Sequence, residues 1–467
     1  MDALTPSRSR GGIVLGGVLV STSSLVPHIR RRARRLVARH RKRRARLAFV
    51  ASPTEDALLT LLAALEAELP FVPLHPRWTP TEREKLLTAF DAALVDPSDD
   101  EPAGDGASGV SGDDRGERRG PTPGEIVLST SGSSGSPKGV RLSRASFVAS
   151  ASAHAANLPF EPRDRWLLAI PFAHAGGLSI VTRCLARGST FVVPSLDVGQ
   201  DPDALLEAIE RDRVTLLSVV PTQLARLLAA DRRGVLPRLR AILVGGAAFP
   251  PELRREAFAR GLATLATYGL TETASQIVTE RPDEARRADA RDSGRPLDSV
   301  EVRVVDEAGL ARQPGEVGRI VVRGPTLFSG YVGGPARRDE PFDTGDLGLF
   351  DEAGRLVVLG RHDDTIVTGG ENVHPTELEG ALLAAPGVRE AVVFGVPDRL
   401  WGEVVAAVLV ARATPAILDA LRGINAGLAP FRRVRRVAFV EALPVEASGK
   451  VSRRSLRERL AGALEPL

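Results

Sequence analysis

The chain has 467 residues, of which 43% are hydrophobic and 26% charged, an ordinary composition for a soluble α/β protein with more than one domain. The formal net charge of +4 excludes an overall field that would by itself point to a polyanionic partner. The single cysteine, Cys184, excludes an internal disulfide and a cysteine-based metal cluster, so we expect a reducing, cytoplasmic compartment.

The N-terminal region is short and basic. Gly11 to Val20 is apolar, but it is too short to span a bilayer and no convincing cleavage site follows, so we expect no leader and no integral membrane segment. Arg30 to Arg46 holds ten arginines and one lysine. Because no aromatic residues interleave with them, this run favours an exposed helix over a nucleic-acid surface.

Apolar runs and helical spacing alternate from Leu47 onward. A strand (47–52), a helix (55–69) and a strand (71–74) predict a βαβ opening. Residues 97–123 are rich in Asp, Gly, Ser, Glu and Pro and predict a mobile surface loop. Beyond it we expect a strand at 125–128, helices at 143–156, 177–187, 203–212 and 221–230, and strands at 165–170, 190–193, 216–220 and 241–244. This alternation predicts parallel sheets with helices on both faces.

Short alternating strands follow, expected at 300–305, 318–322, 348–350 and 356–359, and they predict a small antiparallel or barrel-like piece. A linker-like Gly360 to Asp364 leads to a last segment with its own α+β pattern. We therefore predict an α/β fold in which a large N-terminal domain (1–360), with parallel-rich sheets, flanking helices and a β-barrel-like subdomain, precedes a small mobile α+β domain (361–467).

The segment from Ser129 to Gly139 contains three glycines that allow backbone N–H groups to turn toward an anion, and Lys138 adds a positive charge. Further donors are the hydroxyls of Thr130, Ser131, Ser133, Ser134 and Ser136. A flexible linker is the bland alternative, but the preceding strand and the Pro-Lys-Gly ending favour a phosphate-binding loop. It is not a Walker A loop, because no Gly-Lys-Ser/Thr closes it.

Further polar clusters stand where strands are predicted to end, the place where ligands bind in open α/β sheets. They are Pro171–Gly177, Val244–Ala248, Thr267–Thr273 and Phe342–Asp346, to which Arg361 and Ser448–Lys450 are added. Glu272 could hold Mg²⁺, Asp346 could bind both ribose hydroxyls, and Gly245-Gly246 leaves room for a flat base against the backbone. Together these groups predict an ATP site.

These motifs, in this order, resemble the acyl-adenylate-forming superfamily, and the acyl-CoA synthetase branch within it. The matching segments are 130–139, 268–272, 344–346, 360–364 and 449–450. The resemblance implies that a carboxylate attacks the α-phosphate of ATP to give acyl-AMP and pyrophosphate, and that coenzyme A then displaces AMP. The implied cofactors are ATP, Mg²⁺ and coenzyme A. No nucleophile from the protein is needed, because the substrates supply the attacking atoms.

The resemblance also implies roles for individual residues. The reacting centre would involve Lys450, His174, Thr130 and Glu272, with Glu272 as the Mg²⁺ ligand. The nucleotide would be bound by Thr130, Ser131, Gly132, Ser133, Ser134, Gly135, Lys138, Gly245, Gly246, Ala247, Tyr268, Gly269, Thr271, Asp346 and Arg361. Asp363 would be the hinge of the small domain, and Gly369, Gly370 and Glu371 would form a loop on the coenzyme A side.

Residues 219–228, 268–279 and 369–373 resemble the subfamily of 2-succinylbenzoate–CoA ligases of menaquinone synthesis. The acyl group would then contact His174, Arg183 and Ser275. Because one carboxylate of such an acid reacts, the other needs a cationic partner, and Arg183 is the candidate. The departures are Ser133-Ser134 where threonines are frequent, Val367 where many relatives carry lysine, and a shorter, more basic opening.

Three alternatives remain. An aryl- or fatty-acid–CoA ligase would need no arginine in its acyl pocket. A free-standing adenylation enzyme would load a carrier protein, although the chain reaches Leu467 without a carrier segment. A non-enzymatic nucleotide- or RNA-binding protein would use residues 30–46, but the presence of Lys450, Glu272 and Asp346 together argues against it. We expect small-molecule partners and no nucleic acid, and self-association is left open.

Overall fold

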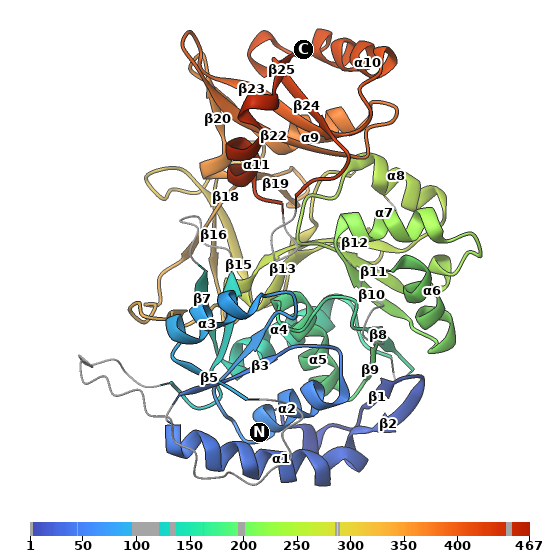
Figure 1. Ribbon diagram of the computed structural model, residues 1–467, viewed down its shortest axis with the longest axis vertical. Coiled ribbons are helices and arrows are strands. Elements are labelled where there is room, and N and C mark those ends of the chain that lie inside the picture. The colour runs from blue at the N-terminus through green and yellow to red at the C-terminus, as the bar shows by residue number, and fades with distance from the viewer. Residues whose placement is uncertain are drawn as a thin grey trace.

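The computed structural model describes residues 3–43, 45–95, 121–130, 137–161, 163–194, 201–284, 287, 290–444 and 451–467, without the side chains of residues 40–43 and 461. It has a large N-terminal part and a small C-terminal part stacked on it (Figure 1). The predicted α/β fold class is confirmed. Most of the predicted 97–123 loop lies outside the described residues.

The largest sheet has nine strands, and its central pairs, from β12 to β1, are parallel. In spatial order the strands are β14 (Arg295–Pro296), β13 (Ser275–Thr279), β12 (Thr264–Leu270), β11 (Ala241–Val244), β10 (Leu216–Val219), β8 (Arg165–Leu167), β9 (Thr190–Val193), β1 (Gly12–Leu15) and β2 (Val18–Ser21). The apolar segment Gly11 to Val20 forms most of the β1–β2 hairpin at the edge of this sheet.

A second sheet has six strands and contains the predicted βαβ opening. Its order is β17 (Gly330–Tyr331), β7 (Lys138–Leu142), β6 (Ile126–Thr130), β4 (Phe71–Leu74), β3 (Arg46–Val50) and β5 (Ala92–Leu94). The helices of the large part are α1 (Thr22–Arg43), α2 (Glu55–Glu66), α3 (Pro80–Ala89), α4 (Arg144–Asn157), α5 (Ala175–Arg187), α6 (Pro202–Arg211), α7 (Pro221–Ala230) and α8 (Pro251–Ala259).

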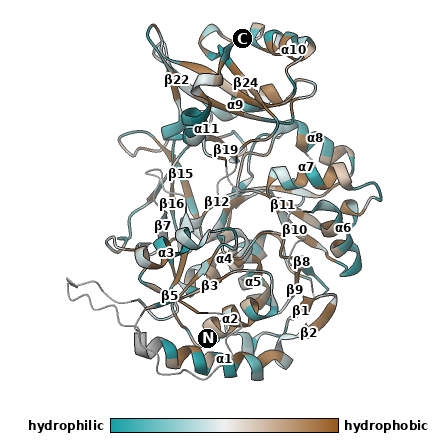
Figure 2. Ribbon diagram, viewed as in Figure 1, coloured by the Kyte–Doolittle hydropathy of each residue, from teal (hydrophilic) through white to brown (hydrophobic). Residues whose placement is uncertain are grey.

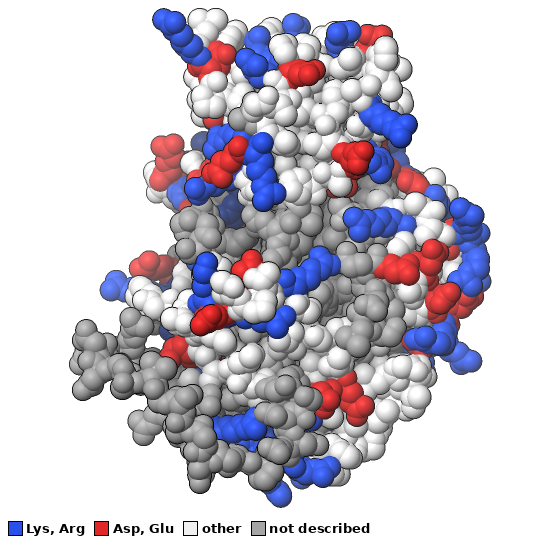
Figure 3. All heavy atoms as spheres, in the orientation of Figure 1, with Lys and Arg blue, Asp and Glu red and all other residues white. Residues whose placement is uncertain are grey.

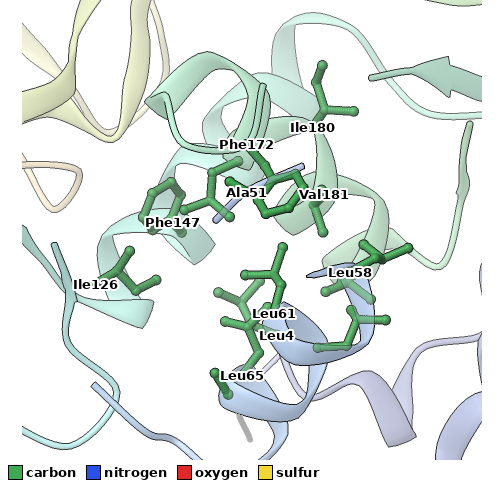
Figure 4. Close-up of a cluster of buried hydrophobic side chains, with 14 of the residues drawn as sticks. Leu4, Ala51, Leu58, Leu61, Leu65, Ile126, Phe147, Phe172, Ile180 and Val181 are labelled. Carbon is green, nitrogen blue, oxygen red and sulfur yellow. The ribbon is translucent and has the colours of Figure 1, made fainter. Parts of the chain in front are cut away.

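Alternating side chains along each strand enter different cores, as a period of two requires. In the nine-stranded sheet, Trp166 packs into the core that contains α2, α4 and α5, whereas Leu167 packs against α6 and α7. Figure 4 shows the middle core, where leucines of α2 lie opposite Ile180 and Val181 of α5. Accordingly, the central strands are brown in the hydropathy view while the outer helices carry both colours (Figure 2).

Helix α1 begins before the arginine run and packs against α2. Its buried side, spaced at three and four residues, is formed by Leu25, Ile29, Ala33 and Leu36. Arg30, Arg31 and Arg34 are exposed, so an arginine-rich surface helix is confirmed there. Arg46 was wrongly placed in that helix, because it begins β3 and is buried. None of the described helices is both long and apolar enough to cross a membrane.

The expected antiparallel piece is a four-stranded sheet in the order β15 (Glu301–Val305), β16 (Gly318–Arg323), β18 (Phe342–Phe350) and β19 (Leu356–Arg361). The small part contains β20 (Ile366–Thr368), β21 (Glu371–Val373), β22 (Glu390–Asp398), β23 (Gly402–Val410), β24 (Arg436–Val440) and β25 (Glu465–Pro466), with α9 (Pro375–Leu383), α10 (Pro415–Ala426) and α11 (Arg453–Leu460). Helix α9 contacts α8 of the large part. The boundary at 360/361 stays a prediction.

Charges of both signs are interspersed on the face in Figure 3, and along α6 to α8 many of them form surface ion pairs such as Arg260–Glu256. Among the described residues fewer ion pairs are buried, and one group of them joins strands. Glu125, which is 3% exposed, accepts from Arg46 of β3 and from Arg141 of β7, each at 2.7 Å. Arg46 also donates to the carbonyl oxygen of Phe90. This triad holds together the strands that flank the predicted phosphate loop.

We expect Glu125→Ala to lower the free energy of unfolding by about 3–5 kcal/mol, because it leaves a buried arginine without its anion. Urea denaturation followed by intrinsic fluorescence measures the change. The control is Asp419→Ala, which removes an exposed pair with Arg422 and is expected to cost about 0–1 kcal/mol. A loss as small as that of the control would contradict a structural role for the triad.

Candidate functional site

Several of the described site candidates lie close to the ends of strands in the two large sheets. Thr130 ends β6, His174 immediately precedes α5, and Gly245 follows β11. Six other candidates lie outside the described residues, namely Ser131, Gly132, Ser133, Ser134, Gly135 and Lys450. Their roles therefore stay predictions.

Glycines shape the backbone where the adenine was predicted. A Cβ on Gly245 would come within 2.8 Å of the Thr267 side chain, so β11 and β12 require glycine there. Gly246 has a φ of +79°, a conformation that favours glycine, and Ala247 follows it on the exposed side. A Cβ on Gly269 would lie 2.1 Å from the carbonyl oxygen of Ser275. These glycines keep one edge of the site free of side chains.

Asp346 is the centre of a polar cluster that joins β12, β18 and β19. The hydroxyl of Tyr268 donates to its Oδ2 at 2.6 Å, and Nη1 of Arg361 donates to its Oδ1 at 3.3 Å. Arg361 also donates to the carbonyl oxygen of Thr344. Burial raises the pKa of Asp346, and the bonds from Tyr268 and the charge of Arg361 oppose that rise. The cluster places acceptor and donor groups side by side, as binding of a vicinal diol requires.

Glu272 lies in a short 3₁₀ turn, Thr271–Thr273, between β12 and β13. The hydroxyl of Tyr331 donates to its Oε1 at 3.0 Å, and the ammonium of Lys138 lies 5.5 Å from the centre of the Tyr331 ring. The structure thus joins Glu272 to the strand that leaves the predicted phosphate loop. Tyr331 was not predicted from the sequence, where its only signal was that the chain has two tyrosines. In the structure, each of the two donates a hydrogen bond to a site carboxylate.

One carboxylate oxygen of Glu272 could bind the Mg²⁺ of an ATP complex. Among the residues that the structure describes, no group donates a hydrogen bond to its Oε2, so this oxygen is available. In the same part of the chain, no three His, Cys, Asp or Glu side chains gather into a metal site. A single carboxylate oxygen suits Mg²⁺, which is usually held by one or two carboxylates together with phosphate oxygens and water. The residues present therefore fit this ion.

Arg183 is a buried cation in the middle of α5, and it is 1% exposed. Its Nη2 donates to the Ser275 hydroxyl at 3.4 Å, its guanidinium lies 5.5 Å from the Trp166 ring, and its Nε has no hydrogen-bond partner. Burial lowers the pKa of Arg183 to about 9, which leaves it charged at neutral pH. No described carboxylate pairs with it. Such a charge is costly unless an anion joins it.

Ser275, the partner of Arg183, has a φ of +108°, and the preceding Ala274 has a φ of +53°. Positive φ values in residues other than glycine are strained and are often found at functional sites. The turn is held by the hydroxyl of Thr273, which donates to the carbonyl oxygens of Leu270 and Ser275 and accepts from the backbone N–H of Leu270. The strain therefore falls on the residue that binds Arg183.

His174 lies apart from Arg183, roughly 13 Å along the helix axis for nine residues of helix. Its ring instead packs against that of His75, with centroids 5.0 Å apart. His75 follows β4, is 5% exposed, and accepts a hydrogen bond from the backbone N–H of Arg77 at Nδ1. Burial, and secondarily the charge of Arg77, lowers the pKa of His75 to about 4. His75 was also missed by the sequence analysis.

The predicted hinge, Asp363, is exposed in the turn His362–Asp364. The next residue, Asp364, accepts from Arg453 at 3.0 Å, and Arg453 also donates to both oxygens of Glu379 in α9. The predicted coenzyme A loop is the turn of the β20–β21 hairpin, where Gly369 packs under Trp401 while Gly370 and Glu371 are exposed. No described contact joins this turn to the site.

Comparison with known proteins gives matches over both parts of the chain. The model of the AMP-binding enzyme family matches residues 14–332, and that of the AMP-binding enzyme C-terminal domain matches residues 377–450. A 2-succinylbenzoate–CoA ligase of Bacillus licheniformis is 38% identical over 335 residues, which are 71% of this chain and 69% of that protein. The corresponding ligase of Bacillus subtilis is 36% identical over 343 residues, 72% of this chain and 69% of that protein.

Solved structures resemble the whole chain. The o-succinylbenzoate CoA synthetase of Bacillus subtilis in complex with its acyl-adenylate intermediate has a TM-score of 0.84 at 28% identity and covers 98% of both chains. An amide bond synthetase of Marinactinospora thermotolerans also has a TM-score of 0.84, at 29% identity and 98% coverage of both chains. The same fold thus serves proteins with different named products.

The lowered pKa of His75 predicts a pH dependence of stability. A histidine that is buried in its neutral form stabilises the fold above its ordinary pKa of 6.5, and this contribution is lost as the pH falls toward 4. We expect the wild-type protein to lose about 3 kcal/mol more than His75→Asn over this interval. Thermal unfolding at a series of pH values measures it. The exposed His28→Asn is the control, and a His75→Asn curve parallel to the wild-type curve would contradict the prediction.

Proposed function

Because the chain belongs to the AMP-binding enzyme family, we propose that it is an ATP-dependent acid–thiol ligase whose acid is 2-succinylbenzoate and whose thiol is coenzyme A. The observation that carries the choice of acid is Arg183, a fully buried cation with no described anion beside it. The relatives named as 2-succinylbenzoate–CoA ligases support the same acid.

The reaction has two displacement steps. A carboxylate oxygen of the acid attacks the α-phosphorus of ATP, the bond to the β-phosphate oxygen breaks, and pyrophosphate leaves. The sulfur of coenzyme A then attacks the acyl carbon, the bond to AMP breaks, and the thiol proton is released. Since the substrates supply both nucleophiles, the protein contributes positioning and stabilisation of charge.

The described residues support a division of this work. Asp346 and Arg361 would hold the ribose hydroxyls, with Tyr268 fixing the carboxylate of Asp346. Glu272 would bind the Mg²⁺ that accompanies ATP. Thr130, Lys138 and the intervening loop would hold the phosphates, and Lys450 would approach the reacting carboxylate and α-phosphate as a point charge on a flexible stem.

The acyl group would lie against α5. Its distal carboxylate would pair with Arg183 and accept from its free Nε–H, while Ser275 fixes the guanidinium through Nη2. His174 would contact the acyl group nearer the reacting end, and the buried His75 ring would hold the His174 ring in place. Burial keeps the His75 ring uncharged at neutral pH, because it lowers the pKa of His75 to about 4, so His75 adds no second cation that would compete for the carboxylate.

The class of acid and the identity of the acceptor can each be tested by comparing substrates. A fatty or aryl acid with no second carboxylate would leave Arg183 unpaired, so it is the less favoured substrate class. A carrier protein or an amine in place of coenzyme A is distinguished by comparing acceptors, since an amide bond synthetase shares this fold. The cytoplasm is the expected compartment, and an assembly into homo-oligomers would be seen by light scattering.

We expect Arg183→Met to lower carboxylate-dependent ATP/pyrophosphate exchange with 2-succinylbenzoate by about 30- to 1,000-fold, the effect of truncating one partner of a buried charge pair. ATP affinity is expected to stay unchanged. The melting temperature of the free protein is expected to hold or rise, because an unpaired buried charge is removed. The control is Arg187→Met, an exposed arginine one turn further along α5.

Exchange that persists in Arg183→Met at the wild-type rate would contradict the role of Arg183 and the choice of a dicarboxylic acid. Absence of exchange in the wild-type protein with a panel of carboxylic acids, 2-succinylbenzoate included, would contradict the ligase function itself. The two failures are therefore distinguishable.

We expect Lys450→Ala to lower the adenylation step at least about 100-fold, the size of effect seen when one stabilising donor is removed from a reacting centre. Thiol transfer from chemically prepared acyl-adenylate is expected to be much less affected, because the α-phosphate no longer reacts. Single-turnover assays measure the two steps separately. Lys85→Ala, an exposed lysine of α3, is the control. Equal losses in both steps would contradict a role confined to adenylation.

A further inference from the structure

We propose that Tyr331 is a positioning residue that fixes the carboxylate of Glu272 for the Mg²⁺ of the bound ATP complex. The inference rests on the proposed function and adds to it a residue outside the motifs from which that function was first predicted. Tyr331 lies in β17, far along the chain from Glu272, and is brought to it by the pairing of β17 with β7.

The contact holds one oxygen of Glu272 and leaves the other available. The phenol O–H of Tyr331 donates to Oε1 at 3.0 Å, while no described group donates to Oε2. The backbone of Glu272 is held by the same segment, because the N–H of Phe328 donates to the carbonyl oxygen of Glu272 at 2.8 Å. A short stretch ending at Tyr331 therefore fixes both the backbone and the side chain of the proposed ligand.

Tyr331 is itself rigidly placed. It pairs with Val140 in the β17–β7 register, and the next residue, Val332, donates to the carbonyl oxygen of Gly139 at 2.8 Å. The Phe328 ring packs edge-on against its ring with centroids 4.9 Å apart. The Lys138 ammonium stands 5.5 Å from the ring centre. These contacts hold the Tyr331 ring on several sides, so its hydroxyl favours one orientation of the Glu272 carboxylate.

The physical benefit lies in the orientation of a single ligand. A free glutamate samples several rotamers, so ordering its side chain when the ion binds costs conformational entropy. Outer hydrogen bonds that orient metal ligands typically change metal affinity by 10- to 100-fold when they are removed. Because phosphate oxygens and water usually supply most ligands of Mg²⁺, a single protein carboxylate such as Glu272 would gain from being held in advance.

The same contact links the metal ligand to the phosphate loop. Lys138 and Gly139 begin β7, directly after the loop, and both touch the Tyr331 segment. Movement of β7 would therefore shift the hydroxyl that orients Glu272. The residue that would hold Mg²⁺ and the strand that follows the predicted phosphate loop therefore belong to one connected set of contacts.

The chain provides a matched control, because its other tyrosine, Tyr268, makes the equivalent bond to Asp346. In both residues a change to phenylalanine removes only the hydroxyl and keeps the ring. If Tyr331 orients the metal ligand and Tyr268 orients the ribose ligand, the first variant changes the dependence of nucleotide binding on Mg²⁺. The second changes nucleotide binding with and without the ion alike.

The test measures ATP binding to the full-length protein by titration calorimetry, once with Mg²⁺ and once with EDTA, in the absence of acid and coenzyme A. We expect Tyr331→Phe to bind ATP in EDTA as the wild type does, and to lose about 10-fold of the gain in affinity that Mg²⁺ gives. Glu272→Gln is expected to lose most of that gain. Tyr268→Phe is expected to weaken binding in both buffers and to keep the ratio. The concentration of Mg²⁺ that half-saturates turnover is expected to rise in Tyr331→Phe.

A Tyr331→Phe variant that keeps the wild-type ratio, while Glu272→Gln loses it, would overturn the role of Tyr331 and leave the proposed function standing. A Glu272→Gln variant that keeps the ratio would overturn the metal role of Glu272 and this inference with it. A weakening of ATP binding in EDTA equal to that in Mg²⁺ would show that Tyr331 serves the nucleotide or the fold, which also overturns the inference.

Discussion

The carboxylate of Glu125, shared between Arg46 and Arg141, is the constraint on which the site depends. It fixes β6 and β7 against β3, and these two strands enter and leave the predicted phosphate loop. The buried ion triad therefore fixes the two strands between which this loop is predicted. Strand β7 pairs with β17, and Tyr331 of β17 donates a hydrogen bond to Glu272. Contacts therefore run from the buried ion triad to the proposed metal ligand.

The candidate site is assembled from segments that are distant in the sequence because the carboxyl ends of parallel strands meet at one edge. Tyr331 of one large sheet contacts Glu272, which follows a strand of the other, and the four-stranded sheet adds Asp346 and Arg361, with Asp346 bonded to Tyr268. Each proposed ligand is oriented by a neighbour from another element: Tyr268 for Asp346, Tyr331 for Glu272, and Ser275 for Arg183. Ser275 has a strained backbone, and the surrounding strands hold that backbone in place while its side chain orients Arg183.

Much of the fold followed from the sequence because the strands are continuous apolar runs and the helices have clear periodicity. The strand end at Val244 was predicted for this reason, whereas the strand predicted at 125–128 extends to Thr130 in the structure. Arg46 was assigned wrongly because its charge resembled that of the preceding arginines, and only the buried Glu125 across the sheet distinguishes it. Tyr331 and His75 were missed because they act through neighbours from other elements, which spacing along the chain does not reveal. Arg183 was predicted as an anion partner. That no described carboxylate pairs with it depends on how the surrounding side chains pack, which the sequence alone does not show.

The placement of Arg183 has a consequence for substrate selection. A pocket can exclude a wrong acid by lacking the space for it, yet a smaller acid always fits a space made for a larger one. A buried cation rejects by a different means, because an acid with a neutral tail would keep the guanidinium desolvated and without a counter-charge. Sites that leave a buried polar group unsatisfied in this way discriminate far more strongly than apolar pockets do. Selectivity against the many monocarboxylic acids of a cell would then be enforced by an electrostatic penalty, independent of the size of the competitor.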